Sequence, residues 1–283
     1  AALQFEYRDA VFNLVDTPGH ADFSEDTYRV LSAVDSAVML VDAARGMEPQ
    51  TLKLFKVCAL RGIPVITVIN KWDRPGQSPL ELIDEISERI GLIPTPLFLP
   101  VGIAGDFRGL LDRRTGEYIH FTRTAGGAKI APEELLDPDA ALEREGDAWI
   151  AAVEESELLS EMGQDHDEEL FLAGQTSPMI FASAMLNFGV RQLLDALVEL
   201  APAPSGRTGI DGTEREVTDP FSAVVALIGT LSPAAPSRAL VVLWVLALPL
   251  AALALPLALA ACGSGSSPCR PIGSTPTITL ARR

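Results

Sequence analysis

Apolar runs with the length of buried strands alternate along this chain with segments that have the spacing of amphipathic helices. The run "PVITVINK" (64–71) is almost wholly apolar, and the segment before it has Pro49 near its first turn and Gly62 just past its last. Further strands are expected over 36–44 and 178–184, and further helices over 24–35, 78–92 and 189–202. Parallel strands need a crossover, so the alternation predicts an α/β fold whose mostly parallel sheet has helices on both faces.

Two stretches at the ends of this pattern differ from it. Residues 3–7 and 11–15 are β-like runs separated by "RDA", which predicts a hairpin that leads into a loop. Between 92 and 176 the alternation gives way to a short β segment and then to the acidic helical segment "ALEREGDAWIAAVEESELLSEM". We interpret this range as an α/β insertion whose carboxylates form a solvated helix face, rather than a catalytic group.

The charge balance restricts the classes of partner. The formal net charge is −16 over 283 residues, which argues against a broad nucleic-acid-coating surface and against DNA as a ligand. The three cysteines form neither a disulfide framework nor a CxxC zinc spacing, and the first residues lack the pattern of a signal peptide. A cytoplasmic protein is therefore expected, and a chain that starts with Ala1 rather than Met is expected to begin within a domain.

The loop after the hairpin, "DTPGHADF", has the composition of a γ-phosphate sensor. In NTPases an Asp at a strand end typically holds Mg²⁺ through water, and a Gly a few residues later offers its amide to the phosphate. Asp16 and Gly19 have this spacing, with Thr17 and the stiffening Pro18 between them. His20 is then expected beside the attacking water, where imidazole can orient the nucleophile; its alternative is an ordinary surface histidine.

The tetrapeptide "NKWD" at the end of the apolar strand has the composition of a guanine clamp. The Asp73 carboxylate can accept two hydrogen bonds from N1–H and the exocyclic amine of guanine, a donor pair that adenine lacks. Asn70 can bond the other edge of the ring, and the stem of Lys71 can cover the sugar or the base. After the last strand, Ser183 and Ala184 are expected to complete the pocket, with the Ala184 amide directed at guanine O6.

Together these stretches resemble the G domain of a translational GTPase, and most closely the bacterial peptide chain release factor 3 family. "DTPGHADF" is shared with elongation factor G relatives, whereas "SEDTYR" and "DEELFLAGQTSPMIFASAMLNFGVRQLLDALVELAPAP" resemble release factor 3. The match covers about residues 3–222 and places a G domain at 1–205, followed by a linker and the start of a β-barrel domain at 206–222.

The resemblance implies a function and a set of roles. Asp16 is similar to the Mg²⁺-linked aspartate, Gly19 to the γ-phosphate sensor and His20 to the catalytic histidine, while the clamp residues named above are similar to the guanine site. GTP or GDP with Mg²⁺ are the implied ligands. The implied partners are the ribosome and the class I release factors, which such a GTPase recycles during termination. An elongation factor G-like or ribosomal-protection GTPase is the alternative, and a membrane-tethered, non-hydrolysing guanine-nucleotide-binding module is another.

The sequence departs from the family at its start. No GxxxxGK[ST] phosphate loop occurs in it, and the switch I threonine expected before Leu3 is absent. We therefore expect a truncated G domain that binds guanine nucleotides weakly and hydrolyses GTP poorly or not at all. The family's first strand would lie between the strands 11–15 and 36–44, so its absence is expected to expose two rows of unpaired backbone groups. We therefore expect the chain to be unstable or to re-pair these strands.

The sequence also departs from the family after about residue 222. Beyond Asp219 no acidic residue follows, and 239–262 is an uncharged run long enough to span a bilayer. We interpret 223–283 as an anomalous apolar tail translated from a shifted reading frame of GC-rich DNA. A genuine transmembrane segment over 239–262, which would suit a membrane-tethered protein but not a ribosomal factor, and a disordered or buried tail stay open as alternatives.

Overall fold

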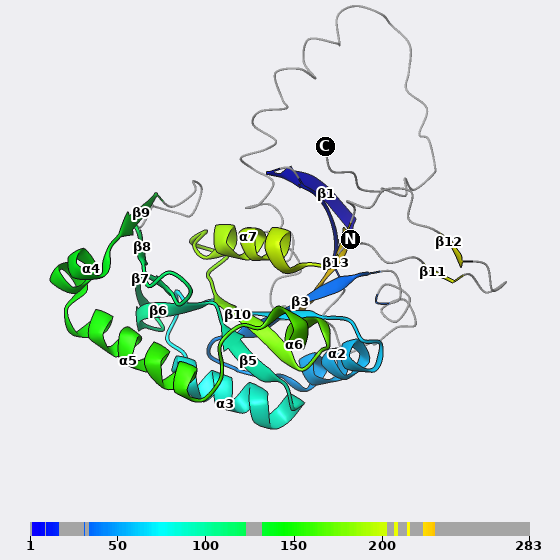
Figure 1. Ribbon diagram of the computed structural model, residues 1–283, viewed down its shortest axis with the longest axis horizontal. Helices are drawn as coiled ribbons and strands as arrows, with labels where there is room; N and C mark the ends of the chain where they lie inside the picture. Colours follow the sequence, from blue (N-terminus) through cyan, green and yellow to red (C-terminus); the bar gives the residue numbers. More distant parts are fainter. Residues whose placement is uncertain are drawn as a thin grey trace, which may run out of the picture.

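The computed structural model describes residues 2–8, 10–16, 31, 34–122, 132–202, 207–208, 214–215 and 223–229. Its main sheet has seven strands (Figure 1). In spatial order they are β1 (Ala2–Tyr7), β2 (Ala10–Asp16), β13 (Ala223–Gly229), β3 (Ser36–Asp42), β4 (Val65–Asn70), β10 (Thr176–Phe181) and β5 (Ile93–Pro96). Only β1 runs antiparallel to its neighbour, β2, so the predicted hairpin and the predicted mostly parallel sheet are both confirmed.

Helices cover both faces of this sheet. Helices α2 (Pro49–Leu60) and α3 (Pro79–Ile90) lie on one side, and α7 (Val190–Leu200) lies on the other (Figure 1). Helix α3 begins with a capping box, in which Ser78 and Glu81 each accept from the other's backbone amide, and ends at Gly91 with φ 74°. Because both faces are covered, β4 and β10 are buried along almost their whole length. This burial explains why their sequences are continuously apolar rather than alternating.

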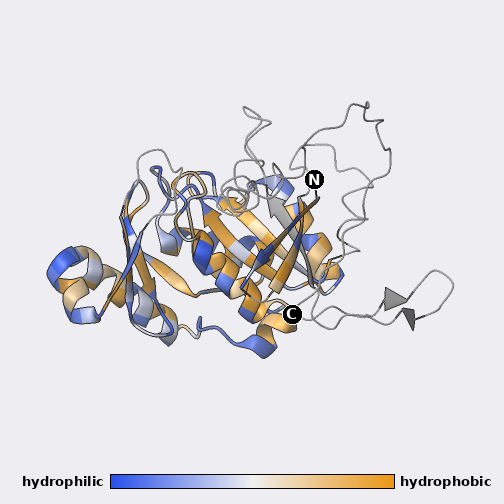
Figure 2. Cartoon of the chain, turned by 90° about the horizontal axis from the view of Figure 1, so that it is seen from above, coloured by the Kyte–Doolittle hydropathy of each residue, from blue (hydrophilic) through white to orange (hydrophobic). Residues whose placement is uncertain are grey.

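The segment between β5 and β10 forms a separate layer of structure. Four strands make an antiparallel meander: β6 (Phe98–Ile103), β7 (Asp106–Asp112), β8 (Tyr118–Phe121) and β9 (Glu133–Leu136). Helices α4 (Pro138–Glu145), α5 (Asp147–Glu161) and α6 (Glu168–Leu172) follow, and α5 packs against β6. Figure 2 shows hydrophobic residues concentrated in the central strands and hydrophilic residues on the outlying helix of this segment.

Strand β13 lies where the sequence lacks the family's first strand. The exposed edges of β2 and β3 were expected to make the chain unstable or to re-pair, and in the structure β13 lies between them and runs parallel to both. Val225 is in register with Leu14 on one side and with Ser36 on the other. The apolar segment "AVVALIG" thus supplies the backbone partners that two exposed edges would otherwise lack.

Other expectations fall outside the described residues. Most of the expected helix 24–35 and the whole apolar run 239–262 lie there. Two short strands, β11 (Arg207–Thr208) and β12 (Glu214–Arg215), pair with each other in the range expected to be a linker and the start of a second domain. Within the residues that the structure describes, no helix has the length and apolarity needed to cross a membrane.

Candidate functional site

Three loops meet at the carboxyl edge of the main sheet. Asp42 ends β3 and Asn70 ends β4, and the two residues are paired in register. Ser183 follows β10, and the Ala182 amide donates to the carbonyl of Ile69 at 2.8 Å. The carboxyl ends of parallel strands are where α/β proteins place their ligands, so this edge is the candidate site.

Asn70 joins the loop after β4 to the loop after β10. Its side-chain oxygen accepts from the backbone amide of Lys71 at 2.8 Å and from that of Ala184 at 3.2 Å. The side-chain NH₂ group of Asn70 has no hydrogen-bond partner among the described residues, so it can donate to a ligand. The Ala184 amide, expected to face guanine O6, contacts Asn70 here, and its role toward the base stays a prediction.

Asp73 is held by a serine from the other loop. The Ser183 hydroxyl donates to Oδ1 of Asp73, while its oxygen accepts from the amide of Leu186 at 3.2 Å. Ser183 is fully buried, and the side chain of Asp73 is only 13% exposed. The second oxygen, Oδ2, forms an ion pair with Arg74, whose Nε lies 3.7 Å away, beyond hydrogen-bond distance. One carboxylate oxygen is thus fixed and the other keeps its capacity to accept.

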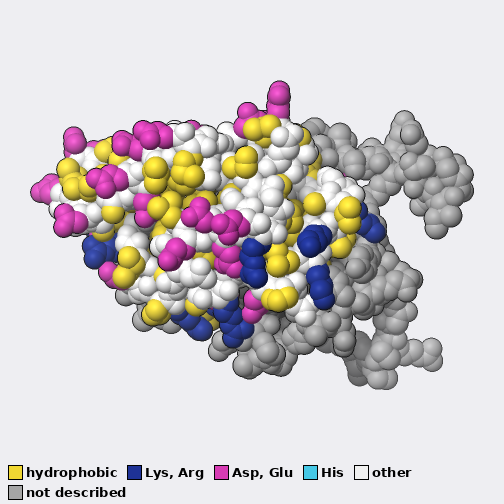
Figure 3. Space-filling view, turned by 90° about the horizontal axis from the view of Figure 1, so that it is seen from below, with side chains coloured by type: hydrophobic (Ala, Val, Ile, Leu, Met, Phe, Trp, Pro, Cys, Tyr) yellow, Lys and Arg dark blue, Asp and Glu magenta, His cyan; other side chains and the backbone are white. Residues whose placement is uncertain are grey.

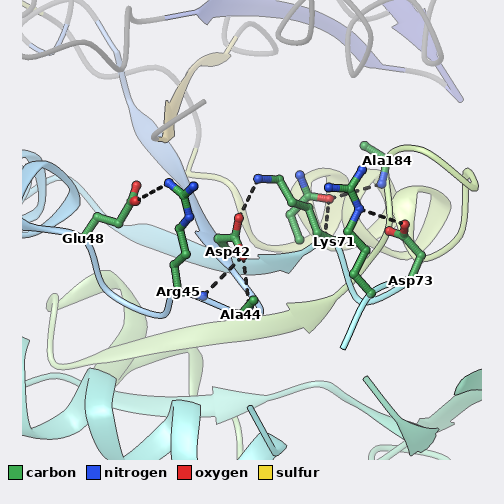
Figure 4. A network of polar contacts seen from close by, with 9 residues as sticks. Asp42, Ala44, Arg45, Glu48, Lys71, Asp73 and Ala184 are labelled. Carbon is green, nitrogen blue, oxygen red and sulfur yellow. Dashed lines mark hydrogen bonds and ion pairs between the residues drawn. The ribbon is translucent and has the colours of Figure 1, made fainter. Parts of the chain in front are cut away.

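Lys71 forms an ion pair with Asp42, which belongs to none of the predicted motifs. Its Nζ lies 2.5 Å from Oδ2 of Asp42, whose Oδ1 accepts from the amides of Ala44 and Arg45 at 2.9 and 3.3 Å (Figure 4). Burial alone would raise the pKa of Asp42, but the hydrogen bonds from Lys71 and the Ala44 amide outweigh it and lower that pKa below its usual value. The signal available in the sequence was an Asp at the end of an apolar strand that neighbours β4.

Trp72 anchors the clamp loop in the hydrophobic core. It is fully buried and packs edge-to-face on Phe181, with ring centroids 4.8 Å apart. Its amide donates to the carbonyl of Ala182 at 3.2 Å, and its carbonyl accepts from the amide of Gly105, at the turn between β6 and β7, at 3.0 Å. The loop is therefore held both by the segment after β10 and by the hairpin of the layer between β5 and β10.

Of the residues predicted to contact the phosphates, the structure describes only the backbone of Asp16. Asp16 lies at the end of β2, in register with Leu227 of β13, and so at the same edge of the sheet as the clamp. The side chain of Asp16 and the residues Thr17, Pro18, Gly19 and His20 lie outside what the structure describes, so their roles stay predictions. In the described part of the chain, no group of three or more His, Cys, Asp or Glu is arranged to hold a metal ion.

Comparison with known proteins identifies the family. The family model described as "Elongation factor Tu GTP binding domain" matches residues 1–203. The chain belongs to the elongation factor Tu GTP-binding domain family. The matched range contains all the strands and loops that form the candidate site. It agrees with the resemblance inferred from "DTPGHADF" and "NKWD".

Three similar proteins share one name. A protein of Microcystis aeruginosa is 50% identical over 208 residues, covering 72% of this chain and 38% of its own length. Proteins of Rippkaea orientalis and Staphylococcus carnosus are 48% and 44% identical, covering 79% and 78% of this chain and 42% of their own lengths. All three are named peptide chain release factor 3, which confirms the predicted resemblance. The chain spans about two fifths of the length of these relatives.

A solved structure supports the fold. The crystal structure of ttk003000868 from Thermus thermophilus matches with a TM-score of 0.55 and 24% sequence identity. The match covers 71% of this chain and 32% of that chain. At this identity the similarity establishes the α/β architecture.

Proposed function

We propose that this chain binds guanine nucleotides through the clamp at Asn70–Asp73 and Ser183–Ala184. The observation that carries the proposal is the pair of contacts between these two loops: Ser183 donates to Asp73, and Ala184 donates to Asn70. Residues more than a hundred positions apart are thereby brought to one edge of the sheet with their polar groups already oriented.

The chemistry of the clamp fits guanine rather than adenine. The Oδ2 atom of Asp73 is an acceptor without a hydrogen-bond donor among the described residues, and guanine presents N1–H and an exocyclic amine on one edge. The NH₂ group of Asn70, which has no hydrogen-bond partner in the described part of the chain, suits the ring acceptors on the opposite edge. Adenine presents an acceptor at N1, so it would leave Oδ2 of Asp73 desolvated and without a donor from the base.

On the phosphate side, we propose that Asp16 holds Mg²⁺ through water and that the amide of Gly19 contacts the γ-phosphate, with Thr17 and Pro18 shaping the loop. His20 would orient the water that attacks this phosphate. Mg²⁺, when bound, neutralises charge on the phosphate oxygens. The sequence contains no GxxxxGK[ST] motif, so we expect the 283-residue chain by itself to bind nucleotide weakly and to hydrolyse GTP slowly.

At the cellular level, we propose a cytoplasmic GTPase of the release factor 3 type that acts on the ribosome to promote recycling of class I release factors. The family match and the names of the relatives support this proposal. It is tested by sedimenting the chain through sucrose with purified 70S ribosomes in the presence of GDP, a non-hydrolysable GTP analogue or ADP. Ribosome binding that depends on a guanine nucleotide is the expected result. Binding that is equal with ADP, or absent in all conditions, would contradict the proposal.

A further inference from the structure

A cleft lies between helix α5 and the segment that follows the clamp loop in the sequence. Its volume is about 470 Å³. One wall is formed by residues 75–79, which lead from the clamp into α3, and by the end of β6, including Pro100 and Gly102. The other wall is α5. The cleft is distinct from the nucleotide clamp, because none of the clamp residues lines it.

The helical wall consists of small residues and one carboxylate. The adjacent Ala151 and Ala152 lie three or four positions from both Ala148 and Glu155, so the four residues form one stripe along α5. The three alanines leave room for a ligand to approach the helix backbone closely. Glu155 stands at the end of this stripe and is the single charged residue among the described residues that line the cleft.

Glu155 lacks a partner within the described part of the chain. No hydrogen bond or ion pair joins it to another described residue, and burial raises the pKa of its carboxyl above the usual value. Helix α5 holds five acidic residues and no basic one, so no cation of its own helix faces Glu155. A half-buried carboxylate without a partner is stabilised by a cation brought from outside.

The other polar groups of the cleft do not favour an anion. The N-terminus of α3 borders the cleft, but the capping box of Ser78 and Glu81 already occupies backbone amides of this terminus. Glu81 also adds a negative charge there, which disfavours an anion. Ile103, at the end of β6, is 72% exposed at the cleft, which gives the opening an apolar rim. Figure 3 shows acidic and apolar side chains interspersed on the face that carries α5 and α3.

We propose that this cleft binds an extended segment of another protein that presents one lysine or arginine next to an apolar residue. The cation pairs with Glu155, its methylene stem lies along the alanine stripe, and the apolar neighbour packs on Ile103. The proposal goes beyond nucleotide binding and does not depend on it.

The test uses the full ¹⁵N-labelled chain without nucleotide and three probes: acetyl-Leu-Arg-Ala-amide, the same peptide with neutral citrulline in place of arginine, and the same peptide with glutamate. Amide shifts of Gly102, Ala151 and Glu155 report binding. We expect the arginine peptide to shift these amides and the E155Q variant to weaken its binding about three- to tenfold. The citrulline peptide should bind wild type as weakly as the arginine peptide binds E155Q, and added salt should weaken only the arginine peptide.

The matched control is E154Q, which removes a charge from the next residue of α5, outside the cleft lining. It should bind the arginine peptide like the wild type. Equal binding of all three peptides, equal binding by E155Q and wild type, or no shift at any of the three amides would overturn the proposal. Shifts of the same amides that depend on protein concentration alone would assign the cleft to a second copy of the chain and would also overturn it.

Discussion

The backbone amide of Ala184 donates a hydrogen bond of 3.2 Å to the side-chain oxygen of Asn70, across 114 positions of the sequence. This contact fixes the orientation of the Asn70 amide, because an oxygen that accepts from Lys71 and Ala184 leaves the NH₂ group facing outward. The selectivity of the site for a base therefore depends on the loop after β10 as much as on the "NKWD" loop itself.

Removal of the Ser183 hydroxyl should weaken the clamp. In Ser183→Ala the Asp73 carboxylate loses its buried donor, so we expect a loss of about 1 kcal/mol in the free energy of unfolding and about tenfold in GDP affinity. Chemical denaturation and competition with a fluorescent GDP measure the two effects. Ser177→Ala is the matched control: Ser177 is buried in β10 and bonds Val65 and Thr67, so it should lose stability while GDP affinity stays unchanged. Equal GDP affinity in both variants would contradict the assignment.

Asp42 should stabilise the fold in a pH-dependent way. Its pKa is lowered in the folded state, so its contribution is complete above the ordinary value of 3.8 and is lost as pH falls through the lower folded value. Asp42→Asn should reduce the free energy of unfolding by about 1 to 3 kcal/mol at neutral pH, because Lys71 loses its partner. Urea titrations from pH 3 to pH 7 should show this difference shrinking below 3.8.

The control for Asp42 is Glu48→Gln, which breaks the more exposed pair with Arg45. It should change the free energy of unfolding by less than about 1 kcal/mol, as surface pairs do. A difference between wild type and Asp42→Asn that is the same at pH 3 and pH 7 would show that Asp42 does not contribute as a charged group.

Strand β13 should be required for the main sheet. Val225→Pro removes a backbone donor from a strand paired on both sides, so we expect destabilisation of more than about 3 kcal/mol and loss of hydrogen-exchange protection in β2 and β3. Val225→Ala keeps the backbone donor and should retain the protection. If β2 and β3 exchange at the same rate in the wild type and in the proline variant, β13 does not occupy this position.

The turn between β6 and β7 should support the clamp. Gly105 has φ 93°, and an added Cβ would lie 3.0 Å from the nitrogen of Pro75. Gly105→Ala should therefore cost about 1 to 3 kcal/mol of stability and weaken GDP binding, since the bond from Gly105 to Trp72 holds the loop. Gly116→Ala is the control, because Gly116 also has positive φ but open space around it. A GDP affinity lowered equally in both variants would refute this role of Gly105.

The sequence was sufficient where local pattern decides structure. The apolar run of β4, the helical spacing over 78–92 and the spacing of "NKWD" predicted a parallel sheet with polar groups at its carboxyl edge. It was insufficient for β13, because "AVVALIG" has no local signal that tells a strand in the main sheet from the apolar residues after it. Its position depends on the two edges it pairs with, which lie more than 180 residues away in the sequence.

The same distinction holds within the site. Asn70, Asp73 and Ser183 were predicted from motifs, but the ion pair of Lys71 with Asp42 was not, since it depends on the register of β3 and β4. The hydrogen bond from Ser183 to Asp73 likewise depends on how β4 and β10 pair, which no short motif specifies.

Selection of guanine by Asp73 can be tested by exchanging the base and the residue together. In Asp73→Asn the side-chain oxygen can still accept from Ser183, while an NH₂ group replaces the oxygen that faces the base. Xanthine presents an acceptor where guanine has its exocyclic amine. The measurement is the affinity of the wild type and of Asp73→Asn for GDP and XDP, by competition under one set of conditions. We expect the wild type to prefer GDP and the variant to prefer XDP, with a change in the GDP-to-XDP preference of about a hundredfold. An unchanged preference in the variant, or a wild type that binds GDP, XDP and ADP equally, would contradict selection of guanine by Asp73.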